Sequence, residues 1–486
     1  MIPIPSEDYI RILPELVLTV FGMAVMLIDP LLPKRASRRP LGWLAFLGTL
    51  LAAAAGAHQV YYPGMAFFGM VRVDSFSIFF HVLITLLAAL VILASLDYLD
   101  QQEIHGGEFY GLVLLGTVGM VLMSSAVELV LIFIALEISS ISTYVLAGFR
   151  RRVAASAESS LKYFLLGSFA TAFFLYGVAL MFGATGTTSI YALAAALHPP
   201  HTPPLAYVAV AFLFVGLGFK VASAPFHVWT PDVYEGAPAP VVALMSTAPK
   251  AAAFAVLLRI FFAAHAPGWF WLVWVSAALT MTLGNLGALV QTNIKRMLAY
   301  SSIAHAGYVL VAFAAAVRQG GISAEGVSAA IFYTAAYGVM NVGAFAVITY
   351  FARAGERYVT LDDYAGLGRR SPALAAALSI FLLSLIGIPI TGGFFAKFYV
   401  FTAAFQSNLV GLTILAVINS AIAAYYYLRV LVVMYMREPR EDAPLPPVPI
   451  AMTTALAVCA LVTLWLGILP GPVLDYASRA ASDLLR

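Results

Sequence analysis

Long apolar runs separated by short polar stretches follow one another along the whole chain. A run of about 20 mostly apolar residues is long enough to cross the hydrocarbon core of a bilayer as a helix. Fourteen such runs can be counted, at approximately 10–30, 41–62, 75–99, 109–126, 127–149, 158–183, 205–226, 239–264, 268–290, 297–317, 324–352, 373–403, 408–436 and 448–469. Because the connecting stretches are short, this pattern predicts an all-α polytopic membrane protein without a soluble domain.

The basic residues between the runs predict how the chain is oriented. Lys and Arg are enriched in loops that stay on the cytoplasmic side. If the N-terminus lies outside, 15 of the 26 Lys and Arg residues fall in inner loops, 5 in outer segments and six inside spans. This bias predicts that both termini face outside and that the arginines at 150–152 face inside.

Composition narrows the class of protein further. Hydrophobic residues make up 62% of the 486 residues, charged residues 10%, and the mean hydropathy is +0.94. Soluble domains carry about 25% charged residues, so a cytosolic enzyme, a disordered protein and a nucleic-acid binder are excluded. The net charge of +3 indicates no acidic partner.

A single cysteine, Cys459, lies inside an apolar run. One thiol cannot form an internal disulfide, a cysteine zinc site or an iron–sulfur cluster, so a small core or lipid-facing residue is expected. The start of the chain lacks the positive segment of a cleavable signal peptide, and the first span is therefore expected to remain as a membrane anchor.

Four charged residues lie deep within predicted spans: Glu137, Lys220, Lys250 and Lys397. A charge at mid-bilayer costs about 3 kcal/mol on insertion scales. Structural ion pairs are one explanation, but three lysines and one glutamate cannot neutralise one another. Burial disfavours the charged form of lysine, so the set is also what a proton relay requires.

Four further basic residues are less deeply placed or less clear in meaning. His305 lies mid-span, where it is either a hydrogen-bonded core residue or a relay member, because its ordinary titration is near neutral. Lys162 lies about four residues into its span, so snorkelling and function are both open. Arg259 and Arg429 lie near span ends, where snorkelling is expected.

Two spans contain helix-breaking residues. The seventh runs into Pro225 and Pro231, and the twelfth contains Pro389 followed by two glycines. Each broken span also carries a deep lysine, a combination typical of internal repeats around an ion pathway. Spans four to eight and nine to thirteen are then equivalent and, being five each, inverted. The predicted divisions are 1–108, 109–264 (first repeat), 265–437 (second repeat) and 438–486.

Two long motifs carry a resemblance to a known family. The stretch Lys-Val-Ala-Ser-Ala-Pro-Phe-His-Val-Trp-Thr-Pro-Asp-Val-Tyr-Glu-Gly-Ala-Pro begins at Lys220, and Asn-Ile-Lys-Arg-Met-Leu-Ala-Tyr-Ser-Ser-Ile-Ala-His-Ala-Gly-Tyr begins at Asn293. Both resemble the antiporter-like subunits of respiratory complex I, the bacterial NADH–quinone oxidoreductase, over nearly the whole chain. The lysine at position 397 and the length of the chain are typical of one of the family's paralogues.

The resemblance implies a role for six residues as a proton relay. It places the fifth-helix glutamate at Glu137, its partner lysine in the seventh helix at Lys220, and further relay members at Lys162, Lys250, His305 and Lys397, the last being the outlet. The implied mechanism is electrostatic: movement of the glutamate away from its lysine releases a proton toward the next lysine.

The resemblance also implies which chemistry lies elsewhere. The chain has no Gly-x-Gly-x-x-Gly after a strand and no cysteine cluster, so no metal or cofactor site is expected in it. NADH, FMN, the iron–sulfur clusters and the quinone, ubiquinone or menaquinone, are expected in partner subunits.

The expected partners are the other membrane-arm subunits, the lipid bilayer and protons, but no nucleic acid. The expected location is the bacterial inner membrane, with both termini on the periplasmic side. Two alternatives remain open: a subunit of a multi-subunit Na+/H+ antiporter, and a structural membrane-arm subunit whose buried charges do no transport.

Overall fold

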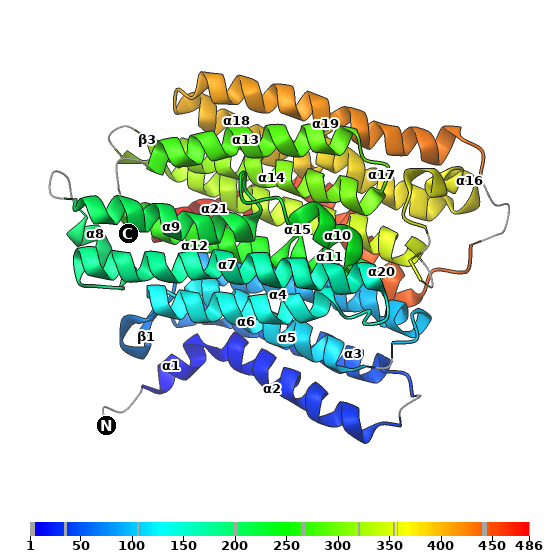
Figure 1. Ribbon diagram of the computed structural model, residues 1–486, viewed down its shortest axis with the longest axis horizontal. Helices are drawn as coiled ribbons and strands as arrows, with labels where there is room; N and C mark the ends of the chain where they lie inside the picture. The colour runs from blue at the N-terminus through cyan, green and yellow to red at the C-terminus, as the bar shows by residue number, and fades with distance from the viewer. Residues whose placement is uncertain are drawn as a thin grey trace.

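A bundle of long, roughly parallel helices makes up the structure, a computed structural model of the chain (Figure 1). It describes residues 5–33, 36–104, 106–197, 202–264, 269–318, 321–352, 355–356, 358–439 and 445–485. Within these residues, 13 helical segments are long and apolar enough to cross a membrane. The prediction of an all-α polytopic membrane protein is therefore confirmed.

The observed helices match the fourteen predicted spans to within a few residues. In order they are α2 (Leu13–Ile28), α3 (Arg39–His58), α4 (Ser75–Gln101), α5 (Glu108–Ser125), α6 (Leu129–Ala147), α7 (Ala154–Thr185), α9 (Pro204–Val221), α11 (Ala239–Met245) with α12 (Ala248–Ala264), α13 (Trp269–Leu289), α14 (Ile294–Ala316), α15 (Ala324–Ala352), α17 (Pro372–Ile386) with α18 (Gly392–Gln406), α19 (Val410–Met436) and α20 (Ile450–Ile468). The fourth and fifth predicted spans, adjacent in sequence, are distinct helices.

Three spans are interrupted. After α9 the chain leaves the helix and re-forms it as the short α10 (Thr230–Gly236), and α17 is separated from α18, so both predicted breaks are present. The eighth span is also divided, between α11 and α12, which was not predicted. Pro249 explains this break, because its ring excludes a helical bond to the carbonyl four residues earlier, at Met245, where α11 ends.

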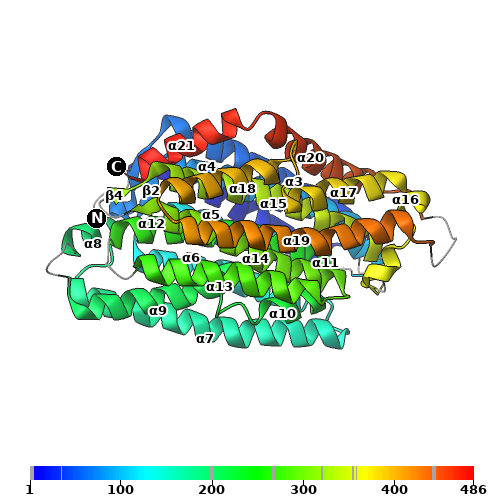
Figure 2. The ribbon, with the colours of Figure 1, turned by 90° about the horizontal axis from the view of Figure 1, so that it is seen from above.

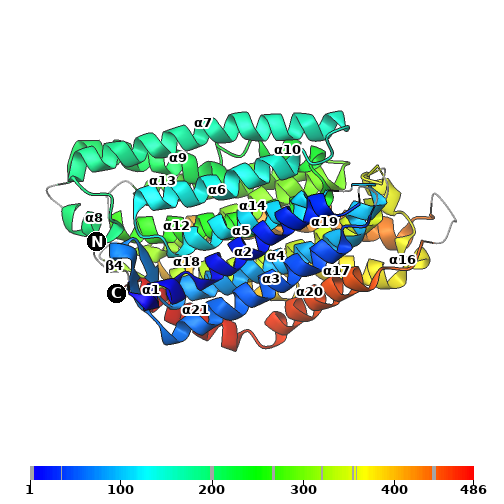
Figure 3. The same cartoon turned by 90° about the horizontal axis from the view of Figure 1, so that it is seen from below.

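Both ends of the chain lie at the same end of the bundle in all three views (Figures 1, 2 and 3). This end, here called the terminal face, contains the short helices α1 (Ser6–Arg11) and α8 (Ile190–Ala196) and the hairpin of β1 (Gly64–Ala66) and β2 (Val71–Val73). A second hairpin joins β3 (Val317–Arg318) to β4 (Gly321–Ile322). The last helix, α21 (Gly471–Leu484), packs on α4 and α15. Because both ends lie at the terminal face, the chain crosses the membrane an even number of times.

The opposite end, here called the basic face, contains α16 (Leu367–Arg370) and the loop with Arg150. Glu356 is buried there and accepts hydrogen bonds from Lys295 Nζ (2.7 Å), Tyr98 OH (2.7 Å) and the Ala239 amide (2.8 Å), with Arg150 at 3.2 Å. Burial alone would raise the pKa of Glu356, but Lys295 and Arg150 hold it below its ordinary value. These hydrogen bonds and the ion pair connect side chains from both halves of the bundle.

A second buried ion pair lies near the terminal face and corrects one prediction. Asp74 caps α4 by accepting from the Ser77 amide (2.8 Å), and it receives two bonds from Arg259 of α12, at 2.9 and 3.1 Å. Burial tends to raise the pKa of Asp74, and Arg259 lowers it below its ordinary value. Arg259 is only 2% exposed, so the prediction that it snorkels is wrong: an aspartate outside the spans provides its partner.

Arg429 on α19 is half-buried and donates to the carbonyl oxygens of Leu289 (3.2 Å) and Gln291. These carbonyls lie at and just beyond the C-terminal end of α13, where a cation is favoured by the helix dipole. Its role is thus to cap a helix end.

Candidate functional site

Lys220 lies in the last turn of α9 and is 4% exposed. Its Nζ donates to Ser140 Oγ on α6 at 2.9 Å and lies 5.9 and 5.8 Å from the ring centres of Tyr144 and Tyr163. Glu137 is one helical turn before Ser140, on the same face of α6. No direct ion pair joins Glu137 to Lys220 within the described residues, and the hydroxyl of Ser140 donates to the Leu136 carbonyl at 2.6 Å, so any interaction of the predicted pair is through space.

Glu137 itself is half-buried, and its Oε1 has no hydrogen-bond partner among the described residues. A carboxylate oxygen without a donor is free to accept one. A donor such as the ammonium of Lys220 would satisfy this oxygen if the two side chains came into contact.

Lys250 follows the break in the eighth span and is 3% exposed. Its Nζ donates to Ser302 Oγ (2.7 Å) and to the Ser302 carbonyl (3.3 Å) on α14. A cavity of about 10 Å³ lies against Lys250, Ser302, His305 and Tyr337. A water molecule needs about 10–15 Å³ and at least two polar partners, so this cavity is the size of one water between lysine and histidine.

His305 is 2% exposed and hydrogen-bonded through both ring nitrogens. Nδ1 lies 2.7 Å from Tyr333 OH, and Nε2 lies 3.3 Å from Tyr427 OH. The ring stacks on Tyr337 with centroids 5.0 Å apart. Because a tyrosine hydroxyl both donates and accepts, either tautomer of the histidine can be satisfied.

Lys397 lies on α18 and is 5% exposed. All three donors of its ammonium are used: the carbonyls of Leu385 (3.0 Å) and Ile386 (2.7 Å) and Ser420 Oγ (2.8 Å) accept from it. The two carbonyls end α17 at the helix break. Free carbonyls at a helix C-terminus stabilise a cation, so the break in the twelfth span is itself part of the lysine's binding site.

Hydrogen-bonded tyrosines and asparagines lie beside Lys397 and His305. Lys397 Nζ lies 5.1 Å from the ring centre of Tyr308, and Asn285 Nδ2 donates to Tyr308 OH at 3.2 Å. Tyr426 OH donates to Asn285 Oδ1 at 3.1 Å. The half of the site that contains Lys250, His305 and Lys397 is therefore lined by side chains that can relay a proton.

Aromatic rings lie on the other side of Lys220. Tyr163 stacks on Trp229 with centroids 4.5 Å apart, and Trp229 contacts Tyr234 edge-on at 6.0 Å. No hydrogen bond joins Lys220 to Lys250 in the described part of the chain. The surroundings of Lys220 are therefore more aromatic than those of Lys250 and Lys397.

Lys162 is placed apart from the other five candidates. Its side chain is 40% exposed, and Nζ contacts Glu158 (2.7 Å) and Asp232 (2.8 Å), while Asp232 also pairs with Arg296 at 2.7 Å. Hydrogen bonding by Lys162 lowers the pKa of Asp232, and Arg296 lowers it further against the effect of burial. No hydrogen bond or ion pair joins Lys162 to another of the six described candidates.

Sequence reasoning missed the neutral groups that hold the lysines. Ser140, Ser302, Ser420 and the tyrosines around His305 were not singled out, and neither was Glu15, a buried carboxylate of α2 with no hydrogen-bond partner among the described residues. A signal was available for two of them, since Ser139-Ser140 and Ser301-Ser302 are serine pairs within apolar spans. Among the described residues, no three His, Cys, Asp or Glu side chains lie together as metal ligands would.

Comparison with known proteins identifies the family of the chain. The family described as "NADH:quinone oxidoreductase/Mrp antiporter, TM" matches residues 126–423. The chain belongs to this family. "NADH-quinone oxidoreductase subunit N 2" of Koribacter versatilis is 66% identical over 491 residues, which cover 99% of each chain. The predicted resemblance to complex I, and within it to subunit N, is confirmed.

Solved structures agree with this assignment. A chain of respiratory complex I from Thermus thermophilus, determined with bound aureothin, is 39% identical with a TM-score of 0.80, covering 95% of this chain and 98% of that one. A chain of the Mrp complex from Dietzia is 22% identical with a TM-score of 0.84, covering 99% and 97%. The second likeness concerns the fold alone.

Proposed function

We propose that this chain is a proton-translocating subunit in the membrane arm of an NADH–quinone oxidoreductase. One observation carries the transport role. Lys220, Lys250 and Lys397 are at least 95% buried, yet within the described residues none has a carboxylate within ion-pairing distance; serine hydroxyls and backbone carbonyls hold all three. A structural ion pair needs a direct partner, whereas a group that must lose its proton does not.

The proposed path begins at Glu137 and Lys220. With the glutamate close, the ammonium of Lys220 is stabilised; with the glutamate withdrawn, a hydroxyl remains as its acceptor and the proton leaves. Lys250 receives a proton in turn. One water in the adjacent cavity connects Lys250 to His305, whose tyrosine contacts lead toward Lys397.

Lys397 is the proposed outlet. Its proton is held by the two carbonyls that end α17, so a change in the helix break alters how strongly the ammonium is bound. Lys162 joins this scheme only indirectly. With Asp232 and Arg296 it forms a charged group at the basic face, where protons would enter if that face is cytoplasmic.

The redox chemistry belongs to partner subunits in this proposal. NADH, FMN, the iron–sulfur clusters and the quinone are bound by other subunits, and this chain contributes only the proton path. The chain lies in the bacterial inner membrane, next to other membrane-arm subunits, with the terminal face toward the periplasm.

We further infer that residues 109–264 and 265–437 are inverted repeats, flanked by 1–108 and 438–486. The two lysine sites support this. Lys220 lies in the last turn before one break and Lys397 binds the last carbonyls before the other, so each half places an ammonium at a broken helix. The neighbouring spans of each half also correspond in number.

The test is made on the assembled complex. Lys250→Ala should lower proton pumping, and with it NADH–quinone turnover, at least tenfold, because the path loses its central group. Lys250→Arg keeps the charge and most of the volume but stays protonated, so it should not restore the rate. Native gels check assembly. If assembled Lys250→Ala and Glu137→Gln complexes both pump at the wild-type rate, the relay is wrong.

A second measurement addresses the Na+/H+ antiporter alternative, because a chain of the Mrp complex has the same fold. The purified complex should contain quinone-reductase subunits, and pumping by it should be unchanged when Na+ is replaced by K+. An assembly of antiporter subunits, or transport that needs Na+, would instead favour the alternative.

A further inference from the structure

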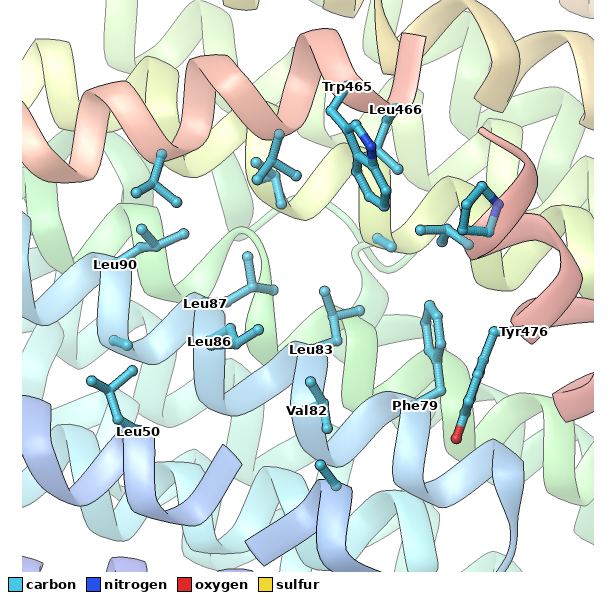
Figure 4. A pocket seen from close by; sticks show the side chains of 18 of the residues that line it. Leu50, Phe79, Val82, Leu83, Leu86, Leu87, Leu90, Trp465, Leu466 and Tyr476 are labelled. Carbon is cyan, nitrogen blue, oxygen red and sulfur yellow. The ribbon is translucent and has the colours of Figure 1, made fainter. Parts of the chain in front are cut away.

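A long apolar groove of about 810 Å³ lies on the side of the bundle formed by α3, α4, α15, α20 and α21 (Figure 4). The helices α3 and α20 form its walls and α4 and α15 its floor. The lining side chains labelled in Figure 4 are, from α3 and α4, Leu50, Phe79, Val82, Leu83, Leu86, Leu87 and Leu90, and from α20 and α21, Trp465, Leu466 and Tyr476. This groove is separate from the lysine site.

The groove runs along the membrane normal. On α4 its lining extends from Ile78 to Leu93, which is about 22 Å at 1.5 Å per residue. On α20 the lining residues Thr454, Val458 and Val462 recur at every fourth position, so one face of that helix is turned into the groove. One leaflet contributes about half of the roughly 30 Å hydrocarbon core, so the groove spans one leaflet and reaches past the midplane.

The end of the groove nearest the terminal face has a polar rim. Phe79 stacks on Tyr476 with centroids 6.0 Å apart, and the side chains stand together in Figure 4. Pro472, Val473 and Tyr476 of α21 line the groove. Arg479 is exposed and three residues beyond Tyr476, which places it on the same face of the helix, next to the opening.

We propose that this groove holds an acyl chain of a phospholipid from the leaflet on the terminal side, with the lipid phosphate bound by Arg479. The almost wholly apolar lining suits a hydrocarbon chain, and a guanidinium at the rim suits a phosphate. A tyrosine beside the opening, Tyr476, is typical of the level at which lipid headgroups begin.

The dimensions favour a lipid over a helix of a partner subunit. A helix with its side chains is a stiff cylinder about 10–12 Å wide, whereas an acyl chain is a single unbranched hydrocarbon that follows the bends between the lining side chains. A flexible chain fits the narrow space between α3 and α20 without displacing either.

The bound lipid would also support the broken twelfth span. Leu466 lines the groove, and its Cβ is 2.9 Å from where a Cβ on Gly392 would lie, at the start of α18. Its neighbour Gly467 lies directly against the backbone of Ile390 in the break. A filled groove therefore holds α20 against the segment that positions Lys397.

The test uses the intact complex in phosphatidylethanolamine vesicles containing a phosphatidylethanolamine with a diazirine on its acyl chain. After irradiation, crosslinked peptides should come from α4 and α20. Val462→Trp fills the groove and should reduce this crosslinking at least fivefold. Leu461→Trp is the matched control, because Leu461 is the adjacent residue, is 67% exposed and does not line the groove; crosslinking should stay within twofold of wild type.

Arg479 is tested by lipid retention. Arg479→Gln should release the co-purified phospholipid, seen by native mass spectrometry, at severalfold lower detergent concentration, while Arg479→Lys should retain it. Equal crosslinking in the Val462→Trp and wild-type complexes would overturn the proposal, as would density for a partner helix in the groove. Because pumping is not measured, failure of the proton relay leaves this result untouched.

Discussion

Each of the three deep lysines is bound by neutral oxygen atoms, and the number of those atoms differs. Within the described residues Lys220 has one hydroxyl acceptor, Lys250 a hydroxyl and a carbonyl of the same serine, and Lys397 two carbonyls and a hydroxyl. Hydrogen bonds to charged groups contribute about 1.5–3 kcal/mol each. Lys397 therefore has the most hydrogen-bond acceptors of the three, whereas Lys220 has fewer but also has the rings of Tyr144 and Tyr163 at 5.9 and 5.8 Å and, in the proposed path, Glu137 as its charge partner.

Ser140→Ala tests the first of these sites. The change removes the hydroxyl that accepts from Lys220, so the buried ammonium is destabilised by about 1.5–3 kcal/mol. Proton pumping by the assembled complex should fall severalfold. Ser139→Ala is the control, since Ser139 is equally buried but its hydroxyl has no partner within the described residues. Equal rates in both variants would show that the hydroxyl at 140 does not hold the lysine.

How far the site could be predicted depends on the kind of residue. The depth of Lys220, Lys250 and Lys397 in apolar runs was enough to predict their burial, because charge in a span is rare and costly. Of their acceptors, only Ser140 and Ser302 have a sequence signal, as members of serine pairs, whereas Ser420 has no such partner and a backbone carbonyl is not marked by any residue type. The prediction that Arg259 snorkels was wrong for a related reason: its partner Asp74 is distant in sequence.

At the scale of the helices, the breaks were predictable where two signals coincide. The twelfth span combines a proline with paired glycines, and the seventh has two prolines within seven residues. The eighth run has Pro240 in its first turn, where proline is compatible with a helix, and only Pro249 in its interior. Isolated prolines are tolerated in membrane helices, so the pattern predicts a continuous helix. The missed break matters because Lys250 follows it directly.

Gly467→Ala tests how closely α20 supports the break between α17 and α18. A Cβ at this position would lie 2.2 Å from the carbonyl oxygen of Ile390, so one of the two segments must move. Such overpacking typically costs about 1–3 kcal/mol, and the complex should inactivate at lower temperature.

Gly411→Ala provides the comparison for that experiment. Gly411 lies in the first turn of α19 with nothing within 4 Å of its added Cβ, and alanine favours helix over glycine by about 1 kcal/mol. Its inactivation temperature should be unchanged or higher. A Gly467→Ala complex as stable as this one would mean that α20 and the break are not in contact in the assembled protein.

At the scale of the whole molecule, charged residues cluster at the two ends of the bundle. At the basic face, Glu356 contacts the basic residues Lys295 and Arg150. Because Lys295 and Arg150 hold the pKa of Glu356 below its ordinary value, the unfolded chain binds more protons there than the folded one. The stabilisation is fully present above the ordinary carboxyl pKa of about 4. It is lost as pH falls through the folded value.

Glu356→Gln should therefore lower the thermal inactivation temperature of the complex at neutral pH, and its difference from wild type should shrink as the pH is lowered below about 4. Glu438→Gln, an exposed glutamate for which no buried partner exists in the described residues, should match wild type throughout. A difference that is constant with pH would show that Glu356 contributes by packing and not by charge.

The last prediction concerns how the two faces are placed across the membrane, which the loop arginines predict and the common end of both termini makes testable. Ser478 lies on α21 at the terminal face, whereas Ser37 bonds Asp100 at the far end of α4. Both serines are exposed, and the native Cys459 is 0% exposed and should stay silent. In spheroplasts, an impermeant maleimide should label Ser478→Cys at once and Ser37→Cys only after permeabilisation. The reverse pattern would invert the orientation and with it the direction of the proposed proton path, while leaving the fold unchanged.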